Sequence, residues 1–199
     1  MINIYDYETL STDLQLAPIV NVACLTIDED RFLSDKPFTF LEVVGLAKTM
    51  KFDIAEQVEK YGRVITNSTL AWWKEQGPQA IKQISPSSKD VSITELPAFM
   101  SSVFTRDEIV FTRGNTFDPV LTTSICKALG VTTPYKWWLD RDTRSFIEGI
   151  ALGHGIDISN AFTPPNMNEK EFIHHNPAHD VAMDILRIQW ILRSVFGKD

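Results

Sequence analysis

Residues 18–27, PIVNVACLTI, are rich in β-branched side chains and almost continuously apolar. A short run of this kind is typical of a strand buried inside a sheet. Residues 2–8 alternate apolar and polar side chains, which predicts another strand, and residues 38–44 (FTFLEVV) predict a third. Because the three segments follow each other closely, we expect them to pair as an antiparallel meander.

The rest of the chain is mainly helical in pattern. Asp53 and Glu56 have the spacing of a capping box, which predicts the start of a helix, and Gly62 predicts its end. A second helix fits residues 68–76 and closes at Gly77 and Pro78. Strands followed by helices, with one later strand, predict an α/β or α+β fold with a mixed sheet. The remaining elements are predicted at residues 92–104, 108–112 (the later strand), 119–129, 142–152 and 177–196.

Composition is that of an ordinary globular protein. At 199 residues, 44% hydrophobic and 23% charged, we expect one domain spanning residues 1–199. No apolar run approaches the ~18 residues of a membrane span, and the N-terminus lacks a signal-peptide pattern. Cys24 and Cys126 each lie in an apolar run, which predicts two buried thiols in a reducing compartment. We therefore expect a cytoplasmic protein without membrane partners.

Charge restricts the possible partners. The formal net charge of −7 argues against broad binding of duplex nucleic acid through basic patches. Residues 113–144 are the one long stretch with more basic than acidic groups. Any bound divalent cations would offset much of the negative charge, so they enter the electrostatic argument directly.

The first candidate site is the pair Asp6 and Glu8. Side chains two residues apart on a strand point to the same side, so both carboxylates would emerge together. The two charges repel unless a cation lies between them, and Mg²⁺ prefers oxygen ligands. The alternative is a polar, solvent-facing side of an edge strand.

The second candidate is Asp118, at the end of the segment RGNTFD (113–118). Here a strand runs into a glycine turn and a carboxylate opens a helix. Because Pro119 favours the first helical position, the motif taken alone favours the alternative that Asp118 is a simple N-cap.

The third candidate is the pair His175 and Asp180. Asn176 would cap the last helix and Pro177 would begin it, which leaves His175 in the preceding loop and Asp180 in the first turn. An unperturbed histidine pKa near ~6.5 suits a general base. Alternatively, Asp180 complements the helix dipole and the histidine is solvated. For the other histidines we expect only solvation; these are His154, His174 and His179.

The three candidate motifs occur in a characteristic order along the chain. Asp-x-Glu in the first strand, Asp after the fourth strand and His-x4-Asp at the last helix resemble the DEDDh 3′–5′ exonuclease superfamily. The segments IYDYETLST (4–12), STLAWW (68–73) and WWLDRDTRS (137–145) further resemble the phage exodeoxyribonuclease A group and small bacterial exoribonucleases. The resemblance covers nearly the whole chain. It implies an RNase H-like fold with a mixed sheet of about five strands, and host cytoplasm as the location if the chain is of phage origin.

The resemblance also implies an activity. It implies hydrolysis of single-stranded DNA from the 3′ end, with RNA as the alternative, and release of 5′-mononucleotides. Two Mg²⁺ or Mn²⁺ ions would be held by four carboxylates, and His175 would take the proton from the attacking water. The implied metal ligands are Asp6, Glu8, Asp118 and Asp180, and the implied substrate contacts are Thr9 and Leu10. Because they lie next to the second motif, Arg113, Asn115 and Phe117 are further candidates for lining the substrate groove.

Several assignments stay open at this stage. Arg141, Asp142 and Arg144 resemble a family signature, but a buried Arg–Asp pair explains them equally well. We expect at most one tryptophan of each adjacent pair, 72–73 and 137–138, to face solvent, and most of the four to lie in the core. A catalytically inactive nucleic-acid-binding protein and a small-phosphate hydrolase are the competing functions. The sequence does not indicate the oligomeric state.

Overall fold

The computed structural model describes residues 1–159, 162–165 and 167–198. In this part of the chain the strands form one five-stranded sheet with the order β3-β2-β1-β4-β5. Strands β1, β2 and β3 pair antiparallel, whereas β4 pairs parallel with both β1 and β5. The predicted mixed sheet is therefore confirmed. The strands are β1 (Ile2–Thr9), β2 (Ile19–Ile27), β3 (Lys48–Lys51), β4 (Val110–Thr112) and β5 (Asp140–Asp142).

The predicted third strand is wrong. Residues 38–44 do not form a strand, because the chain is helical in α1 (Phe40–Leu46). Thr39 caps this helix by accepting a hydrogen bond from the Glu42 amide, and Phe40 and Val43 are buried one turn apart. The apolar residues of this segment therefore have the spacing of a helix, although the segment is also apolar enough to resemble a strand. The third strand of the meander is β3, immediately after α1.

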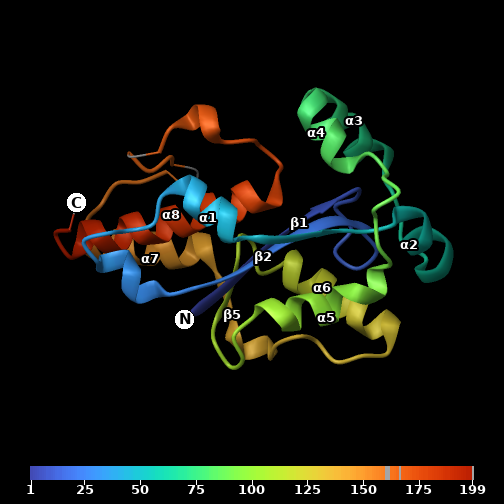
Figure 1. Cartoon of the computed structure of the whole chain (residues 1–199), viewed down its shortest axis with the longest axis horizontal. Helices are drawn as coiled ribbons and strands as arrows, with labels where there is room; N and C mark the ends of the chain where they lie inside the picture. The colour runs from blue at the N-terminus through green and yellow to red at the C-terminus, as the bar shows by residue number, and fades with distance from the viewer. Residues whose placement is uncertain (160–161, 166, 199) are drawn as a thin grey trace.

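Two layers of helices cover the sheet (Figure 1). Even-numbered residues of β1, such as Ile2 and Ile4, pack against α1, α7 and α8. Tyr5 and Tyr7 point to the opposite face and pack against α5 and α6. The sheet thus separates two apolar cores. The α-helices are α1, α2 (Ile54–Tyr61), α3 (Asn67–Glu75), α4 (Pro78–Ile84), α5 (Leu96–Val103), α6 (Asp118–Leu129), α7 (Thr143–His154) and α8 (Pro177–Val195).

The pair α3 and α4 projects from one end of the molecule (Figure 1). Pro78 does not only end α3, as predicted, but opens α4, which the sequence analysis missed. A small third core of Leu10, Val20, Trp73 and Ala80 joins the pair to the sheet. In addition, the Trp73 indole Nε1 donates a hydrogen bond to the Thr9 carbonyl oxygen at 2.9 Å. Helix α3 is therefore attached to the end of β1.

The tryptophan predictions are only half right. Trp73 is 1% exposed and Trp72 is 40% exposed, as expected for neighbours on a helix. Trp137 and Trp138, however, are both exposed, so the prediction of a mainly buried set is wrong. They lie in a short 3₁₀ turn, Trp137–Leu139, which has no buried residue. Both cysteines are buried and free, as predicted. Across the described residues, no helix combines the length and apolar character needed to cross a membrane.

Candidate metal centre and catalytic site

Strand β1 delivers the first two carboxylates to the same place. Asp6 and Glu8 continue the even-numbered side of β1 that carries Ile2 and Ile4 toward α8. The strand is central, with β2 on one side and β4 on the other. The alternative of a solvent-facing edge strand is therefore wrong, and Glu8 is only 9% exposed.

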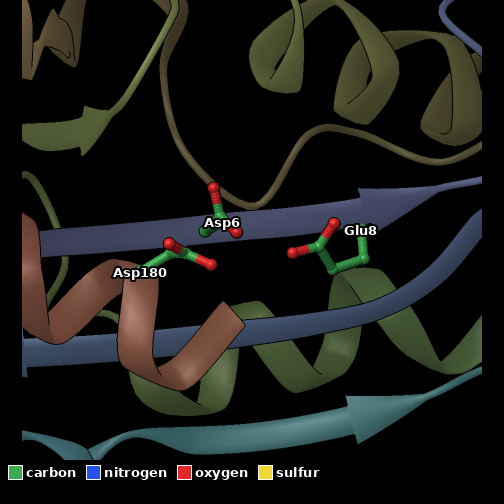
Figure 2. Close-up of side chains that lie close together, drawn as sticks. All are labelled: Asp6, Glu8 and Asp180. Atoms are coloured by element: carbon green, nitrogen blue, oxygen red, sulfur yellow. The ribbon is translucent and has the colours of Figure 1, made fainter. Parts of the chain in front are cut away.

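Helix α8 brings the third carboxylate. Asn176 caps the helix by accepting a hydrogen bond from the Ala178 amide, and Pro177 is the first helical residue, as predicted. Asp180 consequently lies in the first turn, above β1. Carboxylate oxygens of Asp6, Glu8 and Asp180 all lie within 4.8 Å of one another. Figure 2 shows the three side chains turned toward a common point.

Asp118 opens α6 beside this cluster. It is the first helical residue rather than the N-cap, which is Phe117, and no side-chain cap bond forms there. The capping interpretation is therefore wrong. The Thr122 hydroxyl donates to the Asp118 carbonyl oxygen at 2.9 Å and lies 2.8 Å from the Tyr7 hydroxyl. This network attaches the start of α6 to β1, and the Asp118 carboxylate, 4% exposed, lies near enough to Asp6 and Glu8 to raise the pKa of both.

The four carboxylates share one electrostatic environment. Burial, followed by the charge of Asp118, raises the pKa of Asp6 well above its ordinary value. Burial and the charges of Asp180 and Asp118 do the same for the pKa of Glu8. Burial likewise raises the pKa of Asp118 to about 8 and that of Asp180 to about 7. Without cations the cluster therefore holds protons at neutral pH.

This donor set fits divalent cations. It consists of carboxylate oxygens, the ligands that Mg²⁺ and Mn²⁺ prefer. The three closest oxygens have the spacing of ligands around one ion, and Asp118 is near enough to change the pKa of Asp6 and Glu8. A bound cation would also offset the burial and the mutual repulsion that raise these pKa values. The predicted metal ligands thus form a chemically coherent site.

His175 lies in the loop before α8, as predicted. Its backbone has a φ of 60°, in the left-handed region that histidine enters more readily than most residues. Its ring packs against the rings of Trp72 and Trp73, with centroid separations of 4.6 Å and 5.5 Å. Burial, and then the neighbouring His174, lower the pKa of His175 below its ordinary value.

His179 is not solvated, contrary to the prediction. It is buried, and its Nδ1 accepts a hydrogen bond from the Ile173 amide at 3.1 Å. Its ring also contacts Phe40 and Phe172. The prediction failed because His179 occupies the inner face of α8. Its role here is to hold the loop that carries His175.

Asp184 is a charged residue that the sequence analysis did not single out. It lies one turn after Asp180 on α8 and is 2% exposed. Its Oδ1 accepts from Nη1 of Arg113 and of Arg187, both at 2.8 Å, while its Oδ2 accepts from the Thr143 hydroxyl. These contacts tie the end of β4 and the start of α7 to α8. The spacing of four between the two aspartates was the signal available in the sequence.

A cleft of about 430 Å³ opens beside Glu8. Of the predicted substrate contacts, Thr9 and Phe117 line it. Leu10 is buried in the third core and Arg113 pairs with Asp184, and neither lines this cleft. Asn115 lines a separate cavity along α6. The other residues around the cleft are Tyr7, Thr12, Ser68, Thr69, Trp72 and Trp73.

The 141–144 segment does not form a buried Arg–Asp pair. Arg141 is exposed and donates to the carbonyl oxygens of Trp138 and Asp140. Asp142 instead caps α7 by accepting from the Ser145 amide at 2.7 Å. Arg144 is also exposed, and its charge lowers the pKa of Asp118, which places a cation beside the acidic cluster.

Comparison with known sequences gives two matches. Residues 2–185 match the family described as "3′-5′ exoribonuclease Rv2179c-like domain". The chain is also 31% identical over 213 residues to an exodeoxyribonuclease of Enterobacteria phage T4, a match that covers 98% of this chain and 90% of the relative.

Comparison with solved structures identifies the fold of this chain. An exonuclease I structure superposes with a TM-score of 0.67 at 16% identity, covering 97% of this chain and 40% of that one. A zinc-bound complex of E. coli exonuclease I with single-stranded DNA gives a TM-score of 0.64 at 15% identity, with coverage of 98% and 42%. The chain thus spans about 40% of the length of these structures. The likeness confirms the predicted RNase H-like fold.

Proposed function

This chain belongs to the 3′–5′ exoribonuclease Rv2179c-like family of DEDDh exonucleases, and on that premise we propose that it degrades single-stranded DNA to 5′-mononucleotides. The observation that carries the proposal is the convergence of Asp6, Glu8 and Asp180 within 4.8 Å, with Asp118 beside them. Ionised carboxylates this close repel one another, so the metal-free cluster retains protons at neutral pH and bound cations stabilise its ionised form.

Asp6, Glu8, Asp118 and Asp180 would hold two divalent ions, Mg²⁺ or Mn²⁺. When bound, such ions make water a nucleophile at neutral pH and stabilise the charge that develops on the leaving oxygen. His175 would accept the proton of the attacking water. Its lowered pKa keeps the imidazole neutral, and so able to accept a proton, at neutral pH.

The single strand enters through the cleft beside Glu8. Thr9, Phe117 and Trp72 line that cleft and offer a hydroxyl and two aromatic surfaces to a terminal nucleotide. Stacking on aromatic side chains binds single strands without a large basic face. This is compatible with the net charge of −7.

DNA is the favoured substrate because the phage relative, which aligns with 98% of this chain, is named an exodeoxyribonuclease. RNA is the second candidate because the family description names an exoribonuclease. A protein that distinguishes the two must respond to the 2′-hydroxyl group of the sugar.

The test is digestion of matched DNA and RNA oligomers labelled at the 5′ end, in Mg²⁺ and in Mn²⁺. We expect the DNA to shorten stepwise with release of 5′-mononucleotides, and a blocked 3′ end to slow the reaction strongly. Internal cuts at early times would instead indicate an endonuclease, and faster loss of RNA would reverse the substrate preference. Asp118→Asn serves as the inactive control.

A further inference from the structure

Trp72 and Trp73 are neighbours on α3, but they differ in exposure and in their contacts. Trp73 is 1% exposed and donates its indole hydrogen bond to Thr9, so it anchors α3 to the end of β1. Trp72 packs edge-on against Trp73, with a centroid separation of 5.2 Å, yet 40% of it stays exposed. An anchored neighbour therefore holds Trp72 in place while leaving part of its surface open.

Trp72 contacts two parts of the site at once. It lines the cleft that also contains Glu8 and Phe117. The centroid of its ring is also 4.6 Å from that of the His175 ring, whereas the Trp73 ring centroid is 5.5 Å away. The loop before α8 thus rests on α3 through the histidine that precedes the Asn176 cap.

The His175 backbone depends on such support. A φ of 60° is uncommon outside glycine, and residues in sparsely populated backbone regions persist where their surroundings hold them. Among the described residues, the aromatic contacts of the His175 ring are with Trp72, Trp73 and His174. Of these, Trp72 is the one that also lines the cleft through an exposed surface.

We propose that Trp72 is a positioning residue that holds His175 and couples its placement to a nucleobase bound in the cleft. A base that stacks on the exposed part of the indole restricts Trp72, and Trp72 in turn restricts the histidine ring. This inference rests on the proposed function, because it takes His175 as the base and a nucleotide as the occupant. It adds a residue that acts through His175 rather than on the substrate alone.

A double-mutant cycle in steady-state kinetics tests the coupling. Trp72→Ala should lower kcat on the order of 10-fold to 10²-fold, the loss expected when a reacting group is misplaced by about 1 Å. Trp72→Phe should restore most of the rate. In a His175→Ala background, Trp72→Ala should change kcat less than about 3-fold, since the group it positions is gone. Trp137→Ala, an exposed tryptophan in the 3₁₀ turn before β5, is the matched control and should be neutral.

Equal losses of kcat from Trp72→Ala in both backgrounds would overturn the proposal and leave Trp72 as a simple stacking surface. An increase in KM with kcat unchanged would overturn it in the same way. These outcomes require an active wild type. Absence of all nuclease activity in the wild type would instead count against the proposed function, and a second measurement then decides the inference.

That measurement is proton NMR of the His175 ring in the metal-free protein, titrated with 2′-deoxyadenosine. A nucleoside carries no phosphate, so the acidic cluster does not repel it. The His175 ring signal, assigned by its loss in His175→Ala, should move in the wild type and in Trp137→Ala and stay fixed in Trp72→Ala. An equal shift in Trp72→Ala, or no shift in the wild type, overturns the coupling.

Discussion

The carboxylates of Asp6 and Asp180 lie within 4.8 Å of each other, although one is on the first strand and the other on the last helix. The packing of α8 across β1 brings them together, with Ile4 and Val181 in the same core. The fold therefore places like charges in contact, and the apolar core holds them there. Protons relieve that repulsion in the metal-free protein, and bound cations relieve it once the carboxyl groups are ionised.

Removing one of these carboxylates should abolish activity without unfolding the protein. Asp6→Ala or Asp118→Asn should lower turnover by several orders of magnitude, because each removes one of the four proposed metal ligands. In EDTA, either variant should be at least as stable as the wild type, since one repelling charge is gone. Rates in Mg²⁺ and thermal melting in EDTA check both points. Asp35→Asn, at an exposed position, is the control. Near wild-type turnover in either variant would make the two-metal assignment wrong.

The metal-free protein should lose stability as pH rises. The pKa of Asp118 is 3.8 in an unperturbed chain and about 8 in the folded protein, and that of Asp180 is raised to about 7. Between these values the folded state binds protons that the unfolded state has released, so its free energy of unfolding falls with increasing pH. Urea denaturation in EDTA from about pH 5 to pH 8 measures the slope. A flat profile, or a rising one, would contradict the raised pKa values.

Divalent cations should reverse that trend. Because ions bind the deprotonated carboxylates, Mg²⁺ or Mn²⁺ should raise the melting temperature more at pH 8 than at pH 5. The stabilisation is about 2.7 kcal/mol when the free ion is at 100 times its Kd. Differential scanning calorimetry at constant ionic strength measures it. Asp180→Asn should remove most of the shift; if it does not, the ions bind elsewhere.

The site was more predictable from sequence than the sheet around it. Asp6 and Glu8 share a face because strands have a period of two, which is a local rule. Asp180 follows from the Asn176 cap and the Pro177 start, which are also local signals. Residues 38–44 were mistaken for a strand because short apolar runs fit both elements, and burial of Phe40 against Phe172 and His179 is a tertiary contact.

The edge strand β5 and the ion pair between Arg113 and Asp184 could be identified only from the three-dimensional structure. Strand β5, Asp140–Asp142, is three residues long and polar, so it has no apolar pattern, and its pairing with β4 defines it. Asp184 and Arg113 are far apart in the chain, and their ion pair forms only once the fold brings α8 to the loop after β4. Local sequence patterns, such as caps and the spacing of apolar residues, do not reveal contacts between segments that are distant in the chain.

Asp184 should respond to substitution in the opposite way from Asp118. Asp184→Asn leaves Arg113 and Arg187 without the charge they share at 2.8 Å in a site where Asp184 is 2% exposed. Breaking a buried pair by removing one partner costs roughly 3–5 kcal/mol. Urea denaturation in EDTA should therefore show strong destabilisation for Asp184→Asn and none for Asp118→Asn. Equal effects would mean that the two aspartates are electrostatically alike.

The last prediction concerns His175. If it is the general base, the log of kcat/KM rises with pH while the imidazolium loses its proton, and then levels off. Burial and His174 lower the pKa of His175, so the plateau should begin below the ordinary histidine value of 6.5, and bound dications should lower it further. His175→Ala should retain metal affinity, because the four carboxylates remain, but should cost on the order of 10²–10⁴-fold in rate.

His174→Ala is the matched control for that prediction. His174 is exposed, and its ring packs against Phe172 at 4.6 Å rather than against the tryptophans. Its removal should change the rate little and should raise the pKa of His175 slightly, since one source of positive charge is gone. Rate–pH profiles of both variants decide the matter. If His174→Ala abolishes activity and His175→Ala does not, the proton acceptor is His174, and the contacts of Trp72 with His175 are structural.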